Sequence, residues 1–469
     1  MAVPSEASDG ADGRYEHLPV FATAGSGVRP LEAPDAAHAV APRLAPLDGV
    51  RGLSALVVVV GHILTYFVPR AEPHTLLQTP PPAPPPGAPG APPSPPAFGH
   101  GAHPAPFGLE YLSAVTLFFV VSGFTLVSVY EKPALPGAPP PLSTPEQRRT
   151  FIRRRIARLA PVYFLGLAIG VVPFVVYSLP GSPVAFAISV VSSLLCIQSV
   201  VLYAATGWDG PLWTVSALAI CYALFPYLLA VLRRLSYRQL RVVSITMGSV
   251  STAIVCGFLS STGLNLAGVL HFFVGFRIPH FVIGMVAALM TQRRPQRRPV
   301  LSAEVCGLLL LANFAACALI TAALTDGARV YVWLLYSHYA EFLLPCLHAI
   351  WLSALASPDG AHGPSARLLA SAPLRRLGDV SYALYCTHFP ILVWACWAVA
   401  AKGVSWDAAP MHEPNILVGW YLLPTWAIAP LVAVCLAVAA LAHAALEKPA
   451  RSAITKRGEA KADAAVPQN

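Results

Sequence analysis

The chain has 469 residues, of which 56% are hydrophobic and only 11% are charged, and its mean hydropathy is +0.61. This is more apolar surface than one soluble core absorbs, so the composition excludes a soluble globular enzyme and predicts a multi-span membrane protein. The net charge of +9 does not indicate nucleic-acid binding, because the basic residues form short clusters between apolar stretches, the pattern that orients membrane proteins.

The two ends of the chain are predicted to be cytoplasmic tails. Residues 1–45 contain mostly Ala, Gly, Pro and charged residues and no apolar signal segment, so we predict disorder there, and 451–469 form the second tail. The transmembrane domain is predicted over 46–450. Within it, 79–106 are proline-rich and predicted as a polyproline II loop on the non-cytoplasmic side, a spacer or alternatively an arm that recognises a partner or glycan.

Apolar stretches of about spanning length follow one another through this domain. They lie near 52–68, 109–130, 160–180, 184–204, 212–232, 243–262, 266–291, 300–324, 331–356, 378–401 and 417–446. The nine cysteines lie singly and show neither disulfide nor zinc-ligand spacing, so no metal is expected.

The basic clusters between these stretches predict the topology. If all clusters are cytoplasmic, the number of crossings between neighbouring clusters is even. Only the interval from Arg158 to Arg233 holds three stretches, so one of them is expected to be re-entrant or interfacial. Gly210, Pro211 and Pro226 point to 212–232 as that stretch. The predicted fold is an all-α transmembrane bundle of about ten spans with both termini cytoplasmic.

Arg51 and His62 share one face of the first predicted helix, roughly 16 Å apart along its axis. An ionisable group inside an apolar stretch indicates a functional site; a packed histidine bonded to a carbonyl group is the alternative. A neutral buried imidazole is a natural general base for a hydroxyl group, and Arg51 would hold an anionic donor at the cytoplasmic entrance. Asp48 is expected to cap this helix and to hold Arg51 or His62 in place.

A run of arginines precedes the third long apolar stretch. Its members are Arg148, Arg149, Arg153, Arg154, Arg155 and Arg158. Membrane orientation and lipid headgroup contacts explain most such clusters. Binding of a phosphate-rich cofactor is the alternative that the same charges support.

Further polar residues interrupt the later apolar stretches. Ser381, Tyr385 and His388 follow one another at helical spacing, so they share one face of an otherwise apolar helix. Such a stripe faces the bundle interior or a cavity, where it serves either interhelical hydrogen bonding or substrate contact. Glu341 follows a histidine at helical spacing, and Arg277 precedes His280 in the same way.

Taken in order, these segments resemble the acyltransferase 3 family of integral membrane O-acyltransferases over most of the chain. The resembling runs are LDGVRGLSALVVVVGH, LFFVVSGFTL, FIRRRIARLAPVYFL, PLWTVSALAICYALFP, RIPHFVIGM, LGDVSYALYCTHFPI and LEKPAR. Arg51 and His62 stand at the family's Arg-x10-His positions. Three acidic positions of the family pattern differ: they are Leu218, Thr116 and His280 here. These departures point to a divergent acceptor or to loss of catalysis.

The resemblance implies an acyl-CoA donor, often acetyl-CoA, and a hydroxylated acceptor such as a carbohydrate, a lipid-linked glycan or a small metabolite. His62, supported by Asp48, would deprotonate the acceptor hydroxyl or carry the acyl group itself. The residues expected to bind coenzyme A are Arg51, Arg153, Arg154, Arg155 and Arg158. Those expected to line the substrate cavity are Ser122, Trp213, Ser381, Tyr385, His388, Glu341 and Arg277, with Ser122 and Tyr385 as oxyanion donors.

Two other functions fit the same sequence. One is a non-enzymatic multi-span transporter of a lipid or glycan, with the intramembrane polar residues along its path. The other is a catalytically inactive homologue. The lipid bilayer is the expected partner in each case, and the sequence leaves open whether it is the plasma membrane, an inner membrane or an endomembrane.

Overall fold

The computed structural model describes residues 41–67, 108–131, 140–178, 182–201, 208–262, 272–293, 299–323, 343–400 and 425–453. Every regular element within these ranges is a helix, and six helices are long and apolar enough to cross a membrane. The all-helical membrane protein predicted from sequence is thereby confirmed, whereas the count of about ten spans is not. The proline-rich segment 79–106 and Glu341 lie outside the described residues.

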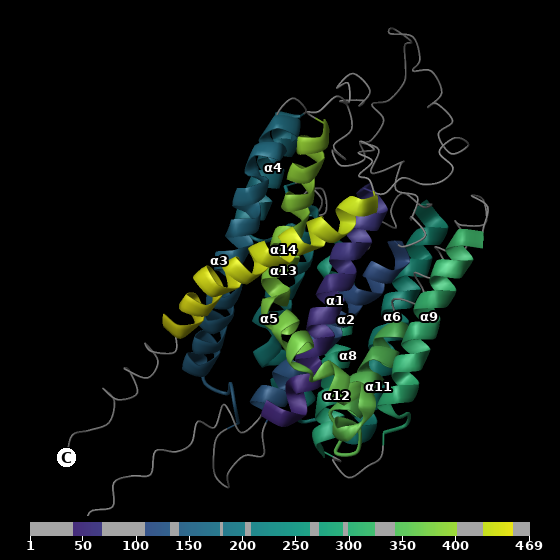
Figure 1. Cartoon of the computed structure of the whole chain (residues 1–469). Coiled ribbons are helices and arrows are strands. Elements are labelled where there is room, and N and C mark those ends of the chain that lie inside the picture. Colours follow the sequence, from purple (N-terminus) through teal and green to yellow (C-terminus); the bar gives the residue numbers. More distant parts are fainter. Residues whose placement is uncertain are drawn as a thin grey trace, which may run out of the picture. The chain divides into compact units, whose positions relative to one another are not determined.

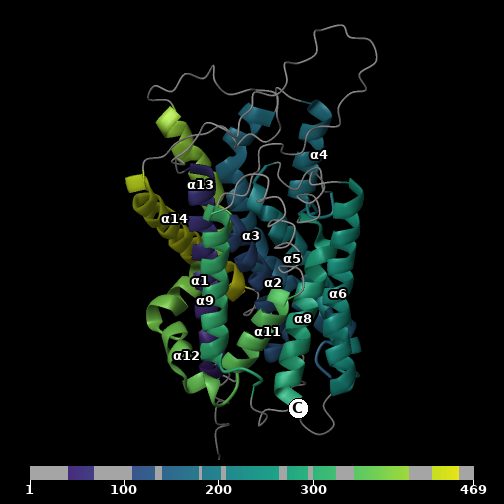
Figure 2. The same ribbon diagram turned by 90° about the vertical axis from the view of Figure 1, so that its right-hand side faces the viewer.

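Most of the long helices run side by side (Figures 1 and 2). The long helices are α1 (Ala41–Phe67), α2 (Gly108–Tyr130), α3 (Pro145–Ser178), α5 (Trp213–Leu232), α6 (Tyr237–Thr262), α8 (Val274–Arg293), α9 (Ala303–Ala323) and α13 (Ala372–Ala400). The shorter ones are α4 (Pro183–Leu194), α11 (Leu344–Leu355), α12 (Pro364–Leu369) and α14 (Ile428–Ala442). Helix α14 crosses α13 obliquely in Figure 1 and continues into the π-helical turn η7 (His443–Glu447).

Helices α1 and α13 pack closely and in parallel, and this pair positions the candidate site. A Cβ atom on Gly52 would lie 2.6 Å from the backbone nitrogen of Gly378, and one on Gly378 would lie 2.2 Å from the carbonyl oxygen of Asp48. The absence of side chains at these glycines lets the two backbones meet, as small residues do between membrane helices. Further along both helices, His62 meets His388.

A second close crossing joins α2 and α8 at Gly123 and Gly284. A Cβ atom on Gly284 would lie 2.0 Å from the carbonyl oxygen of Val120, and one on Gly123 would lie 2.1 Å from that of Phe281. Gly284→Ala is therefore expected to push the helices apart and to cost about 1–3 kcal/mol of stability, read as a lower unfolding temperature in detergent. Gly170→Ala is the matched control, since its Cβ would meet nothing closer than 3.4 Å. Equal losses in both variants would contradict this account of the crossing.

The start of α1 differs from the sequence prediction. The helix begins at Ala41, so Asp48 lies inside it and is not the N-cap that we predicted. The upstream start is possible because Pro42 lies in the first turn, where the missing N–H breaks no helical hydrogen bond. Pro46 is inside the helix, at the cost of one such bond.

The interrupted stretch is 184–204 and not 212–232, which corrects the prediction. In the first stretch, α4 ends at Leu194 and the chain turns at Cys196, whose φ is 55°. Helix α5, by contrast, continues for 20 residues. Pro211 does not interrupt it, because this proline lies in the short turn that precedes α5, where no intrahelical bond is lost.

Candidate functional site

Two buried histidines, one on α1 and one on α13, form the centre of the candidate site. His62 and His388 are 7% and 0% exposed, and His62 Nδ1 lies 2.9 Å from His388 Nε2. Their rings stack with centroids 5.1 Å apart, and the ring of Phe389 packs edge-on against His62 at 5.7 Å. The sequence analysis expected both histidines at the site but did not predict that they are hydrogen-bonded to each other.

The contacts of this pair assign a proton to one nitrogen of each neutral ring. His388 Nδ1 lies 2.8 Å from the carbonyl oxygen of Tyr385, and because a carbonyl only accepts, Nδ1 is the donor. His388 then accepts through Nε2, so His62 donates from Nδ1. This tautomer leaves the lone pair of His62 on Nε2, which is the nitrogen able to take a proton from a substrate.

The other two members of the α13 polar stripe are placed differently. The Tyr385 hydroxyl donates to the carbonyl oxygen of Pro211 at 3.2 Å, and its ring packs edge-on against Phe118 of α2 at 5.5 Å. The Ser381 hydroxyl donates to the carbonyl oxygen of Gly378 within α13, at 2.7 Å. Tyr385 therefore lies beside the histidine pair, whereas Ser381 makes its hydrogen bond within its own helix.

A second buried polar group lies where α8 meets the start of α5. The guanidinium carbon of Arg277 is 6.0 Å from the ring centroid of Trp213, and Arg277 Nη1 is 3.3 Å from His280 Nδ1. Since a guanidinium only donates, His280 accepts this hydrogen bond. The imidazole thus contacts Arg277 at a position where the resemblance led us to expect an acidic residue.

The remaining residues singled out from the sequence lie on α2 and α5. Ser122 is half-buried on α2 and Thr116 is buried on the same helix. Leu218 of α5 packs partly buried against the apolar core. The position where the family pattern carries an acidic residue is therefore in contact with the apolar core.

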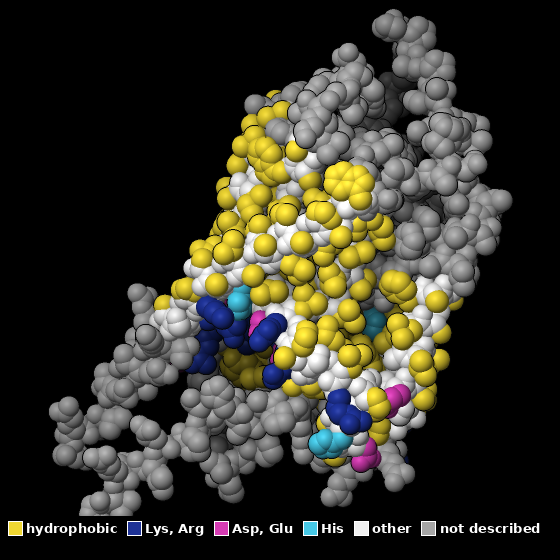
Figure 3. Space-filling model, viewed as in Figure 1, with side chains coloured by type: hydrophobic (Ala, Val, Ile, Leu, Met, Phe, Trp, Pro, Cys, Tyr) yellow, Lys and Arg dark blue, Asp and Glu magenta, His cyan; other side chains and the backbone are white. Residues whose placement is uncertain are grey.

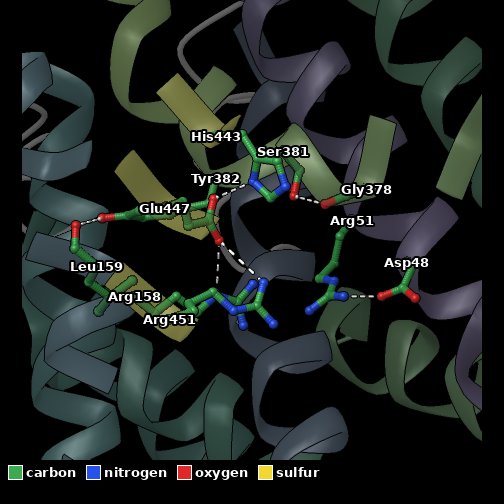
Figure 4. A network of polar contacts seen from close by, with 10 residues as sticks. All are labelled: Asp48, Arg51, Arg158, Leu159, Gly378, Ser381, Tyr382, His443, Glu447 and Arg451. Carbon is green, nitrogen blue, oxygen red and sulfur yellow. Dashed lines mark hydrogen bonds and ion pairs between the residues drawn. The ribbon is translucent and has the colours of Figure 1, made fainter. Parts of the chain in front are cut away.

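Three guanidinium groups point into one region at the end of the bundle where α1 and α3 begin (Figure 4). Arg51 forms an ion pair with Asp48. Arg158 Nε lies 3.6 Å and Arg451 Nη1 lies 3.8 Å from Glu447 Oε1. Three positive and two negative charges leave this cluster, which we call the arginine cluster, with a net positive charge. Asp48 thus lies beside Arg51 as predicted, but the imidazole partner of His62 is His388.

Glu447 lies between Arg158 and Arg451 of the arginine cluster. It is buried in the π-helical turn η7, and its second carboxylate oxygen lies 2.9 Å from His443 Nδ1. π-Helical turns are rare and occur frequently at functional sites. The sequence analysis did not place Glu447, Arg451 or His443 in the site. These three residues are spaced four apart at the end of the last apolar stretch, and this spacing could have shown that they share one face of a helix.

The arginine-rich run at the start of α3 divides into inward and outward side chains. The guanidinium of Arg155 lies over the rings of Phe151 and Tyr222, at 5.3 Å and 5.6 Å from their centroids. Arg153 and Arg154 are exposed. Figure 3 shows Lys and Arg side chains gathered below a broad apolar surface. This arrangement is typical of the boundary between lipid and water.

Comparisons with known proteins identify the chemistry in general terms. A family model described as an acyltransferase domain matches residues 44–444. The acyltransferase MdmB of Streptomyces mycarofaciens is 27% identical to this chain over 297 residues, which is 60% of this chain and 67% of that protein. No solved structure matches. The residues matched by the family model include His62 and His388, and the match ends three residues before Glu447.

Proposed function

Since this chain belongs to the acyltransferase family whose model covers residues 44–444, we propose that it moves an acyl group from acyl-CoA to a hydroxyl group. It is an integral membrane acyltransferase with several apolar helices. The proposed donor is acetyl-CoA, and the proposed acceptor is a carbohydrate, a lipid-linked glycan or a small metabolite. The observation that carries this proposal is the hydrogen bond between His62 of α1 and His388 of α13, together with the position of Arg51 on α1, eleven residues before His62.

The arginine cluster provides the proposed binding site for the phosphates of coenzyme A. Guanidinium groups bind phosphate through paired, charge-assisted hydrogen bonds. Arg155 and Arg158 of α3 lie in the inward-facing part of the run, and Arg451 joins them from the C-terminal end of the chain. We propose that this end of the bundle and both termini are cytoplasmic, because basic clusters favour that side.

The donor would extend from the arginine cluster along α1 toward His62. The helical rise places Arg51 and His62 roughly 16 Å apart along the axis, so phosphate binding and acyl transfer occur at different depths. Holding the thioester at the base in this way removes much of the entropic cost of bringing two substrates together.

The proposed reaction uses His62 Nε2 as a general base. Nε2 takes the proton of the acceptor hydroxyl while the oxygen attacks the thioester carbonyl, so a C–O bond forms. The C–S bond then breaks, and the proton passes from Nε2 to the departing sulfur of coenzyme A. Ser122 is the proposed hydrogen-bond donor to the developing oxyanion, and Tyr385 would join it by turning its hydroxyl away from the carbonyl oxygen of Pro211.

Purified full-length protein and radiolabelled acetyl-CoA test this function. We expect release of free coenzyme A and appearance of label in a hydroxylated product. Mass spectrometry of glycans and metabolites from a deletion strain and its parent would identify the acceptor. Absence of coenzyme A binding and release would refute the donor. Flux of a lipid or glycan into vesicles without any label transfer would instead support a transporter. Label retained by the denatured protein would show acyl transfer to the enzyme.

Arg51→Gln is expected to weaken coenzyme A binding about tenfold, because a charge-assisted hydrogen bond to phosphate is lost. Isothermal titration with coenzyme A measures this effect. Arg238→Gln is the matched control, since Arg238 is exposed at the start of α6, away from the cluster residues described above. Unchanged affinity in the Arg51 variant would remove this side chain from the donor site.

A further inference from the structure

Asp209 carries a buried carboxyl group that has no partner in the part of the chain that the structure describes. Its side chain is 5% exposed, and neither carboxyl oxygen has a hydrogen-bond partner among the described residues. It stands directly before the turn η2 (Gly210–Leu212) but does not cap it. Leaving such a group unsatisfied is costly, and unsatisfied buried polar groups in native proteins are often found where a ligand binds or a reaction occurs.

The segment that carries Asp209 is linked to the histidine pair through the ring of Phe389. The next residue is Gly210, and a Cβ atom there would lie 3.9 Å from the ring of Phe389, which packs against His62. The carboxyl group of Asp209 packs against α3: its Oδ2 atom would lie 3.5 Å from a Cβ atom placed on Gly166. One aromatic ring therefore separates the segment that carries Asp209 from the proposed general base.

The polar groups around Asp209 are bonded to other partners. Trp208 Nε1 donates to the carbonyl oxygen of Leu167 at 2.9 Å, the Tyr385 hydroxyl donates to Pro211 at 3.2 Å, and Gln198 Nε2 donates to Leu212 at 3.3 Å. These bonds fix the segment on both sides of Asp209. If the role of Asp209 were to hold the segment in place, we would expect at least one of these three donors to bond to its carboxyl group. None of them does.

We propose that Asp209 binds a second hydroxyl group of the acyl acceptor while the reacting hydroxyl lies at His62. The proposal rests on the proposed function. An unpaired carboxylate is expensive to bury, so the protonated acid is the form expected here. A carboxylic acid donates one hydrogen bond and accepts others, as a hydroxyl group does, so the two are complementary. The acceptor class is then a polyol or sugar, and Asp209 selects the hydroxyl that is acylated.

Dicyclohexylcarbodiimide, an apolar reagent for protonated carboxyl groups, tests the proposal on the purified full-length protein. Peptide mass spectrometry is expected to find the adduct on Asp209 in the wild type and in Asp359→Asn, which removes an exposed carboxylate, but not in Asp209→Asn. Octyl glucoside serves as the hydroxylated probe and is expected to slow labelling about tenfold near saturation. Octane and octylamine, which carry the same chain without hydroxyl groups, are expected to leave the rate unchanged.

Three results would overturn the proposal. They are an unreactive Asp209, labelling that octyl glucoside does not slow, and protection by octylamine, which would indicate an ionised carboxylate that binds a cation. Coenzyme A binding distinguishes these failures from failure of the proposed function. Asp209→Asn is expected to bind coenzyme A with wild-type affinity, whereas a wild-type protein that does not bind it refutes the function itself.

Discussion

His62→Ala is expected to lower kcat for acyl transfer by about two to four orders of magnitude, the usual contribution of a general base. The variant removes the nitrogen that is proposed to take the hydroxyl proton but leaves the arginine cluster intact. The affinity for coenzyme A should therefore remain unchanged. Single-turnover transfer from radiolabelled acetyl-CoA and titration with coenzyme A measure the two quantities separately.

The matched control is His362→Ala, which removes an exposed histidine from the turn before α12. It should transfer acyl groups at the wild-type rate. The His62 variant leaves His388 without its ring partner, so its unfolding temperature has to be compared with that of the wild type. A folded His62→Ala protein with wild-type turnover would exclude His62 from the mechanism.

His388→Leu is expected to lower kcat by about two orders of magnitude or more, because His62 loses the acceptor that fixes its tautomer. This effect does not require contact between His388 and the substrate, so His388 is a positioning residue. His388→Gln is the informative partner variant. Its amide oxygen accepts from His62 Nδ1 and its amide nitrogen can donate to the carbonyl oxygen of Tyr385, so it should recover a large part of the rate.

The two His388 variants separate positioning from simple packing. A packing role predicts that both variants lose activity in proportion to their loss of stability. The tautomer account predicts recovery by glutamine at unchanged coenzyme A affinity, together with a pH–rate profile closer to that of the wild type. Equal activity of the leucine and glutamine variants would refute the tautomer account.

Helical periodicity alone predicted the parts of the site that lie on one helix. The spacing of Arg51 and His62 and the stripe of Tyr385 and His388 follow from 3.6 residues per turn. The hydrogen bond between His62 and His388 joins residues 326 positions apart, and it depends on the close approach of α1 and α13. That approach is determined by side chains and glycines on both helices, which no local pattern reveals.

Other differences arise from competing local signals. Gly210 and Pro226 drew attention to 212–232, although the interruption lies at Cys196, where an ordinary residue adopts a positive φ. The sequence analysis did not single out Asp209. Its importance becomes visible only when the burial of its side chain and the hydrogen bonds of its neighbours are known.

The parallel pairing of α1 and α13 also affects how the protein is made. Helix α1 carries the proposed base, and the residue proposed to orient this base is synthesised 326 residues later. A nascent or truncated chain that lacks α13 therefore holds His62 without its orienting partner. We therefore expect the protein to become competent for acyl transfer only after α13 has been inserted.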